Sequence, residues 1–340
     1  MAEMTVDQAL AQAEAFVRDG DLDKARKLYQ AILDDVPGEV RAKAALAKLT
    51  EGESPATTTN DPPQEVLEGL VALYNQHQFA AVAEQAGRLT RQYPDAFILW
   101  NILGASGAQS RQLALAEKAF RRAAELAGGH PEPLNNLGNA LKEQGKLDEA
   151  VDAYQRALAA KPDYVLALNN LGVCLQEQDR VDEAIEAYRK ALTHQPDYAE
   201  AHNHLGVALQ LQGNLDAAVA SYRQALSIAP KYVDALNNLG NAHRDNKDLD
   251  AAIAAYRSAL RIKPNYIIAH NNLGVALKEQ VKLDEAVAAY KQALALDPDY
   301  TEALSNLGSA LQAQGKPEDA VAAYRKALAS NPGYIEAQIN

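Results

Sequence analysis

The sequence predicts an all-α fold, an α-solenoid in which antiparallel helix pairs stack into a right-handed superhelix. First, prolines recur every 34 residues from Pro162 to Pro332. Second, the run Asn135–Leu158 returns at Asn169–Leu192 and, with changes, at every later unit to Ser305–Leu328. Third, 13 of the 15 tyrosines occupy two fixed places in this period. A fixed period of this length is typical of stacked structural repeats.

Each unit of 34 residues is predicted to be two amphipathic helices. We number the positions 1 to 34 in the units that begin at Pro131, Val165, Ala199, Val233, Ile267 and Thr301. Positions 4, 7, 8 and 11 form one apolar stripe of helical period, and positions 20, 24 and 27 form a second. Glycine at position 15 of three units suits a left-handed turn between the helices, and proline at position 32 ends the second helix.

Close packing of the two helices is predicted from three positions. Glycine at position 8 and alanine at position 20 let the helices approach, and tyrosine at position 24 fills the space beside them. Seven tyrosines, counting Tyr29, lie at position 24 and six at position 34, so we expect them to be architectural rather than catalytic. Neither helix buries its apolar face alone, so neighbouring units must stack.

At these positions, and at Trp100, Leu103 and Gly104 of unit 97–130, the sequence resembles the tetratricopeptide repeat family. The resemblance is nearly consensus over residues 131–334. It implies a superhelix that holds partner proteins in a concave groove.

The repeat pattern also predicts the domain organisation. Residues 1–50 are expected to form one similar repeat plus a lone helix, 51–62 a flexible linker, and 63–130 two divergent repeats. Six consensus repeats are expected over 131–334, and 335–340 match the start of a further repeat. We therefore expect the chain to be part of a longer protein.

Composition excludes several classes of protein. The 340 residues contain 33 Lys and Arg against 45 Asp and Glu, a net charge of -12, which argues against a nucleic-acid partner. No apolar stretch long enough for membrane insertion is present, and no signal peptide is visible. The single cysteine, Cys174, excludes a disulfide framework and fits a cytoplasmic protein; at position 10 it is expected to be a buried small residue.

The candidate binding residues are asparagines of the first helix. At about 100° per residue, positions 2, 9 and 13 lie opposite the core stripe, with positions 5 and 6 on either side, so these positions are expected to line the groove. An amide offers two donors and an acceptor, which suits the main chain of an extended peptide. The alternative is that these residues serve helix packing or are solvated. The candidates are Asn136, Asn170, His204, Asn238, Asn272 and Asn306 at position 6, Asn135, Asn169, Asn203, Asn237 and Asn271 at position 5, and Asn139 and Asn241 at position 9.

Other chemistry is not expected. His202 and His204 are two residues apart and point to different helix faces, and no motif for a phosphate, metal or nucleophile is present, so we expect no cofactor, no metal and no catalytic residue. Acidic or apolar residues at position 2 and asparagine at position 5 depart from the Lys/Arg and Asn clamp of family members that bind acidic chaperone C-termini.

The asparagine array resembles that of the O-linked N-acetylglucosamine transferases and their bacterial Spindly-like relatives. This resemblance implies a non-catalytic, substrate-recognition part of a larger bacterial protein-modifying enzyme, glycosyltransferase-like or a repeat-fused sulfotransferase, with its transferase domain beyond Asn340. The alternative is a stand-alone assembly or adaptor protein that self-associates, for example as a homodimer.

Overall fold

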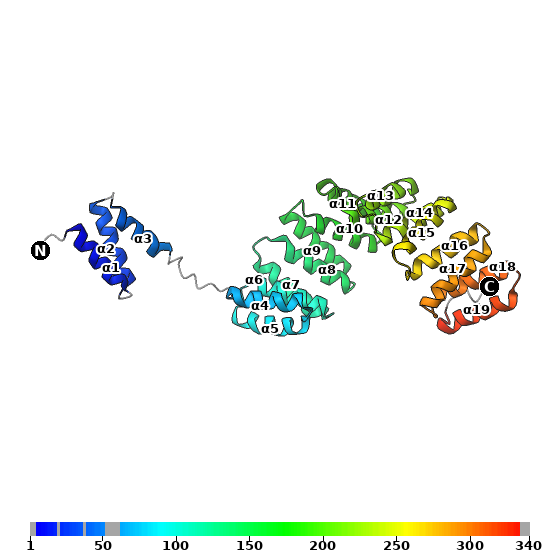
Figure 1. Cartoon of the computed structure of the whole chain (residues 1–340), viewed down its shortest axis with the longest axis horizontal. Coiled ribbons are helices and arrows are strands. Elements are labelled where there is room, and N and C mark those ends of the chain that lie inside the picture. The colour runs from blue at the N-terminus through cyan, green and yellow to red at the C-terminus, as the bar shows by residue number, and fades with distance from the viewer. Residues whose placement is uncertain (1–4, 19–20, 37–38, 52–61, 334–340) are drawn as a thin grey trace. The chain divides into compact units, whose positions relative to one another are not determined.

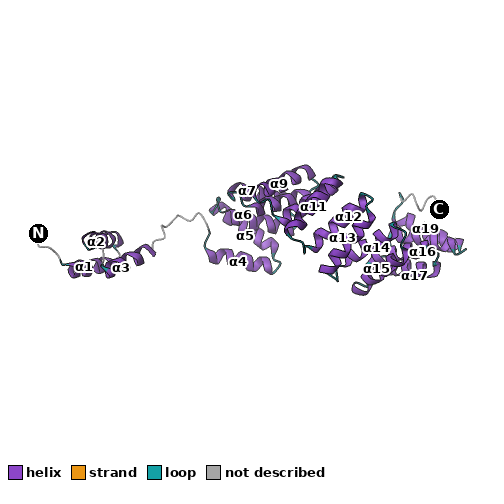
Figure 2. Cartoon of the chain, turned by 90° about the horizontal axis from the view of Figure 1, so that it is seen from above, coloured by secondary structure: helices purple, strands orange, loops and turns teal. Residues whose placement is uncertain are grey.

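The computed structural model describes residues 5–18, 21–36, 39–51 and 62–333. Within these ranges every regular element is an α-helix (Figure 2), and consecutive helices pack in pairs, which confirms the predicted all-α solenoid. The predicted start of a further repeat at 335–340 lies outside the described residues, as does nearly all of the predicted linker.

The chain divides into two compact units, Met1–Val71 with Arg88–Ala96, and Ala72–Gly87 with Phe97–Asn340. The first unit contains α1 (Val6–Arg18), α2 (Leu22–Asp35) and α3 (Val40–Glu51), packed around Leu10, Ala13, Ala25, Tyr29 and Ala42. Two further helices, α4 (Gln64–Asn75) and α5 (Phe79–Gln92), have residues in both units.

The second unit contains the regular repeats. Helices α6 (Phe97–Gln109) and α7 (Leu113–Leu126) form its first complete pair. Six pairs of near-constant length follow, with 13 residues in the first helix and 14 in the second, and Figure 1 shows them following one another. They are α8 (Pro131–Glu143) with α9 (Leu147–Ala160), α10 (Val165–Glu177) with α11 (Val181–His194), α12 (Ala199–Leu211) with α13 (Leu215–Ile228), α14 (Val233–Asp245) with α15 (Leu249–Ile262), α16 (Ile267–Glu279) with α17 (Leu283–Leu296), and α18 (Thr301–Ala313) with α19 (Pro317–Ser330).

The contact between position 8 and position 24 holds each pair together, as predicted. A β-carbon added to Gly240 would lie 2.5 Å from Cε1 of the Tyr256 ring, and the same contact recurs in all six repeats. The Tyr256 side chain is fully buried. Glycine is therefore required at position 8 because the aromatic ring occupies the volume that any side chain would need.

Stacking between repeats extends the core along the unit. The second helix of each repeat contacts the first helix of the next, and consecutive first helices also touch. One continuous cluster of buried side chains runs from Ala116 in α7 to Ala242 in α14. Each repeat therefore depends on its neighbours to bury its apolar faces, as the sequence predicts.

The turn between the two helices has a left-handed residue at position 15 in every consensus repeat. Glycine fills this position in three of them, with φ of 75° at Gly145, 82° at Gly213 and 73° at Gly315. The other three have Asp179, Lys247 and Val281 at φ between 62° and 64°. This conformation is unfavourable for residues with a β-carbon, and most of all for β-branched valine.

Replacing Val281 by glycine is expected to raise the free energy of unfolding by about 1 kcal/mol, because a left-handed conformation costs an L-residue about 1–2 kcal/mol. Little packing is lost, since Val281 is 75% exposed. The reverse change, Gly213→Val, should lower stability. Guanidinium denaturation of both variants measures the effect, and a Val281→Gly protein less stable than the parent would contradict it.

Candidate functional site

The position 6 side chains are half-buried and each is anchored to the preceding repeat. In the five consensus repeats with asparagine at this position, Nδ2 donates a hydrogen bond to Oδ1 of the position 5 asparagine one repeat earlier. The pairs are Asn136 with Asn101 at 3.3 Å, Asn170 with Asn135 at 3.0 Å, Asn238 with Asn203 at 3.1 Å, Asn272 with Asn237 at 3.1 Å, and Asn306 with Asn271 at 3.0 Å. The two predicted rows thus form a series of separate bonds, each between two consecutive repeats, here called the asparagine ladder.

The position 5 side chains lie inside the ladder rather than along an open groove. Asn135, Asn169, Asn203 and Asn237 are only 4–5% exposed and Asn271 is 7% exposed. They are covered because consecutive first helices touch, and position 5 lies at that contact. The structure therefore differs from the expectation that position 5 borders the groove, and it places these side chains at the repeat interface.

His204 replaces asparagine in one rung and keeps the link. Its Nδ1 lies 2.9 Å from Oδ1 of Asn169, and since a carbonyl oxygen can only accept, Nδ1 carries the proton and donates. Burial lowers the pKa of the His204 imidazole, which favours the neutral ring. A neutral histidine therefore substitutes for the donor of the missing amide.

The position 9 asparagines serve the core tyrosines. Asn139 Oδ1 accepts from the Tyr154 hydroxyl, and Asn241 Oδ1 accepts from the Tyr256 hydroxyl, both at 2.7 Å. Where position 9 is not asparagine, glutamine at position 12 can accept instead, as Gln210 does from the Tyr222 hydroxyl at 3.1 Å. These amides are therefore partly committed to the fold.

Tyr290 has neither acceptor. Its repeat has Val275 at position 9 and Lys278 at position 12, and the buried hydroxyl finds no hydrogen-bond partner among the described residues. Tyr290 is thus a natural example, within the described part of the chain, of a core tyrosine without its usual bond.

One cleft in the second unit gathers some of the predicted residues. It encloses about 350 Å³ and is lined by residues of α6 to α8 and by Tyr74. Asn136 at position 6 and Asn139 at position 9 both face it, together with Glu143 at position 13. These are the positions that the helical period predicts for the groove, and here they enclose space that a ligand could occupy.

A second link between repeats was not predicted from the sequence. The Asp at position 18 is the second residue of its helix, and its Oδ1 accepts from the glutamine at position 14 of the next repeat. The pairs are Gln178 with Asp148, Gln212 with Asp182 and Gln280 with Asp250 at 2.7 Å, and Gln314 with Asp284 at 2.8 Å. The sequence feature that could have indicated these bonds is the recurrence of aspartate at position 18 and glutamine at position 14.

His202 and His270 contact backbone carbonyl oxygens, and Cys174 lies in the core. Nε2 of His202 lies 2.9 Å from the Pro196 carbonyl oxygen, and Nε2 of His270 lies 2.8 Å from that of Pro264. Cys174 is fully buried, as predicted, and burial raises the pKa of its thiol to about 11. No three His, Cys, Asp or Glu side chains gather into a possible metal site within the described ranges.

No described helix is long and apolar enough to cross a membrane.

The stacked helix pairs and the links between them define a helical-repeat protein with the scaffold fold of protein-interaction solenoids. Family models described as tetratricopeptide repeat or TPR repeat match residues 10–49, 95–163, 135–199, 175–233, 221–254, 240–281, 282–315 and 301–334. Together these matches span more than half of the chain. The chain belongs to the tetratricopeptide repeat family.

The chain is also similar to individual proteins, each over a different share of its length. An uncharacterized protein of Mycobacterium tuberculosis is 57% identical over 44 residues, which are 13% of this chain and 14% of that protein. The crystal structure of MamA is 31% identical and aligns with 48% of this chain and 95% of its own, at a TM-score of 0.45. The Cut9–Hcn1 hetero-tetramer of APC/C is 16% identical and matches over 98% of this chain and 75% of its own at a TM-score of 0.58, which supports the fold.

Proposed function

We propose that this chain is a non-catalytic scaffold that holds an extended protein segment along the position 6 side chains of its repeats. The observation that carries the proposal is the asparagine ladder, in which each position 6 amide is held at one end by the preceding repeat. A side chain that is already oriented loses less entropy when it binds a ligand.

The anchored amides retain hydrogen-bonding capacity for a peptide. Asn170, Asn238 and Asn306 each use one N–H of Nδ2 within the ladder, which leaves the second N–H and the carbonyl oxygen for a peptide main chain. Asn272 differs, because its Nδ2 donates to Asn241 as well as to Asn237 and only its oxygen remains. Asn136 is also singly anchored, because its Nδ2 donates only to Asn101, so these four residues are better placed to bind than Asn272.

Histidine substitutions separate binding from stability. Asn170, Asn238 and Asn306 are changed together to histidine, which keeps the link to position 5 as His204 does at 2.9 Å but removes the free amide. Peptides selected from a random display library on the full chain are expected to bind this triple variant at least about tenfold more weakly, since each lost hydrogen bond contributes about 0.5–1.5 kcal/mol. Isothermal titration calorimetry measures the change.

The control is Asn237→Ala, which removes the position 5 acceptor of Asn272 at the repeat interface. It should lower the melting temperature and weaken binding much less than the triple variant does. Unchanged peptide affinity in a triple variant that melts like the parent would refute the proposed role of the ladder.

We further propose that the scaffold presents protein substrates to a transferase of the same polypeptide, glycosyltransferase-like in its use of an asparagine-lined groove. The support is the recurrence of asparagine at position 6 in five of the six consensus repeats. The coding sequence after Asn340 tests this idea: a transferase domain there would support it, whereas a stop codon would favour a stand-alone adaptor. Analytical ultracentrifugation then tests the self-association that an adaptor of this kind requires.

A further inference from the structure

The tyrosine at position 34 is covered by a lysine of its own repeat in two places. Lys161 Nζ lies 5.6 Å from the centre of the Tyr164 ring, and Lys263 Nζ lies 4.9 Å from the centre of the Tyr266 ring. Both lysines are at position 31, three residues before the tyrosine. A cation over an aromatic face is attracted by the negative charge of the ring's π-electrons.

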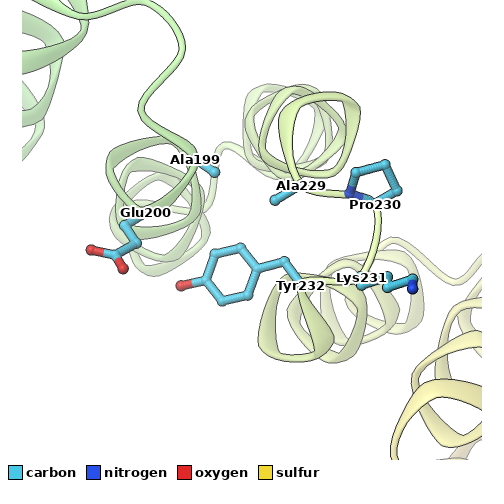
Figure 3. A pocket seen from close by; sticks show the side chains of 6 residues that line it. All are labelled: Ala199, Glu200, Ala229, Pro230, Lys231 and Tyr232. Carbon is cyan, nitrogen blue, oxygen red and sulfur yellow. The ribbon is translucent and has the colours of Figure 1, made fainter.

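The repeat at 199–232 lacks this covering lysine. Position 31 is Ala229 there, whereas the other five consensus repeats have lysine, glutamine, aspartate or asparagine. Position 1 of the same repeat is also alanine, Ala199. The two short side chains leave an open space of about 560 Å³ beside Tyr232, here called the Tyr232 pocket (Figure 3), lined by Ala199, Glu200, Ala229, Pro230, Lys231 and Tyr232.

The Tyr232 pocket is acidic at one end. Figure 3 shows the Tyr232 hydroxyl pointing toward the Glu200 carboxylate, while the Lys231 side chain extends away from the ring. Glu200 Oε2 accepts from the Tyr198 hydroxyl at 3.1 Å, and Glu200 has no ion pair among the described residues. Burial raises the pKa of the Tyr232 hydroxyl, and the Glu200 and Asp234 carboxylates raise it further.

We propose that the Tyr232 pocket binds the side chain of a lysine from a bound protein segment, with the ammonium over the Tyr232 ring and near the Glu200 carboxylate. Within this chain, Lys161 and Lys263 already make the ring contact at the equivalent place. The open space supplies room for a cation from outside, and the Glu200 carboxylate, which forms no ion pair within the described residues, supplies the charge.

This inference deepens the proposed function, because the lysine belongs to a segment that the scaffold holds. The binding of an ammonium group by itself does not need the asparagine ladder. A probe without a peptide main chain therefore tests the pocket separately from the ladder.

The experiment is a titration of the full chain, labelled on its tyrosine rings, with n-butylammonium chloride, followed by NMR. The Tyr232 signal is assigned as the one missing from Tyr232→Phe. We expect a saturable shift of this signal in the parent chain and in the triple histidine variant. Ala229→Lys introduces the lysine that two other repeats have at this position. It should reduce the affinity for n-butylammonium at least about fivefold, the equivalent of a cation–π contact of about 1 kcal/mol.

Ala295→Lys is the matched control, because it adds the same charge at an exposed position of α17. It should leave the titration unchanged. A second comparison uses Nα-acetyl-lysine amide and Nα-acetyl-glutamine amide, and the lysine compound is expected to bind at least about fivefold more tightly. The proposal is overturned if the parent signal shows no saturable shift, if Ala229→Lys binds as the parent does, or if the two amides bind equally.

Discussion

Replacing Tyr222 by alanine is expected to lower the free energy of unfolding by about 3–5 kcal/mol, as large aromatic truncations in cores do. Tyr222 is fully buried between α12 and α13, against Gly206, and belongs to the cluster that runs through five repeats. The substitution removes the contact of the ring with Gly206 and leaves a cavity in the core that the neighbouring repeats share. Guanidinium denaturation measures it, and hydrogen exchange should place the loss around residues 199–232.

Two phenylalanine variants separate the ring from the hydroxyl. Tyr222→Phe removes only the bond to Gln210 Oε1, at a cost of about 0.5–1.5 kcal/mol. Tyr290→Phe removes a hydroxyl that has no partner in the described structure, so it should be neutral or slightly stabilising. A Tyr222→Ala protein as stable as the parent would mean that position 24 is not the core position assigned to it.

Replacing Gly240 by alanine is expected to lower the free energy of unfolding by about 1–3 kcal/mol or more, because it adds a methyl group to a filled core. The new β-carbon would lie 2.5 Å from Cε1, 2.7 Å from Cδ1 and 2.8 Å from Cζ of Tyr256. The ring cannot move away easily, since it is fully buried. Thermal and guanidinium unfolding measure the change.

Gly69→Ala is the matched control for the effect of glycine in a helix. Gly69 lies within α4 and a β-carbon there meets nothing within 4 Å, so alanine should stabilise by up to about 1 kcal/mol. The double change Gly240→Ala with Tyr256→Leu should cost less than the sum of the single changes, because the smaller side chain relieves the clash. Strict additivity of the two would contradict the proposed contact.

Features within a repeat could be predicted from the sequence because each depends on the helical period. The stripe of positions 4, 7, 8 and 11, the fit of Tyr256 against Gly240 and the left-handed residue at Gly145 follow from spacing and side-chain size. The left-handed turn at Val281 could not be predicted from residue preference, since a β-branched residue disfavours this conformation and valine nevertheless adopts it between α16 and α17.

Contacts between consecutive repeats could not be predicted from the sequence in the same way. The period places position 5 beside position 6 on the surface of one isolated helix, but it does not say that the next helix covers Asn237 and leaves Asn238 half-exposed. The bonds from Asn272 to Asn237 and from Gln280 to Asp250 each join different repeats. Only the distance between two stacked helices decides such contacts, and a single repeat does not contain that information.

The links between repeats also have a consequence for folding kinetics. The ladder bonds join residues 35 apart and the Gln–Asp bonds join residues 30 apart, at the N-terminal end of the array as at its C-terminal end. The chain segment that must close before such a bond forms therefore has the same length wherever the bond lies. We expect the folding rate to depend on the addition of one repeat to an existing neighbour, so that an array of this kind can gain or lose whole repeats without slowing the elementary step.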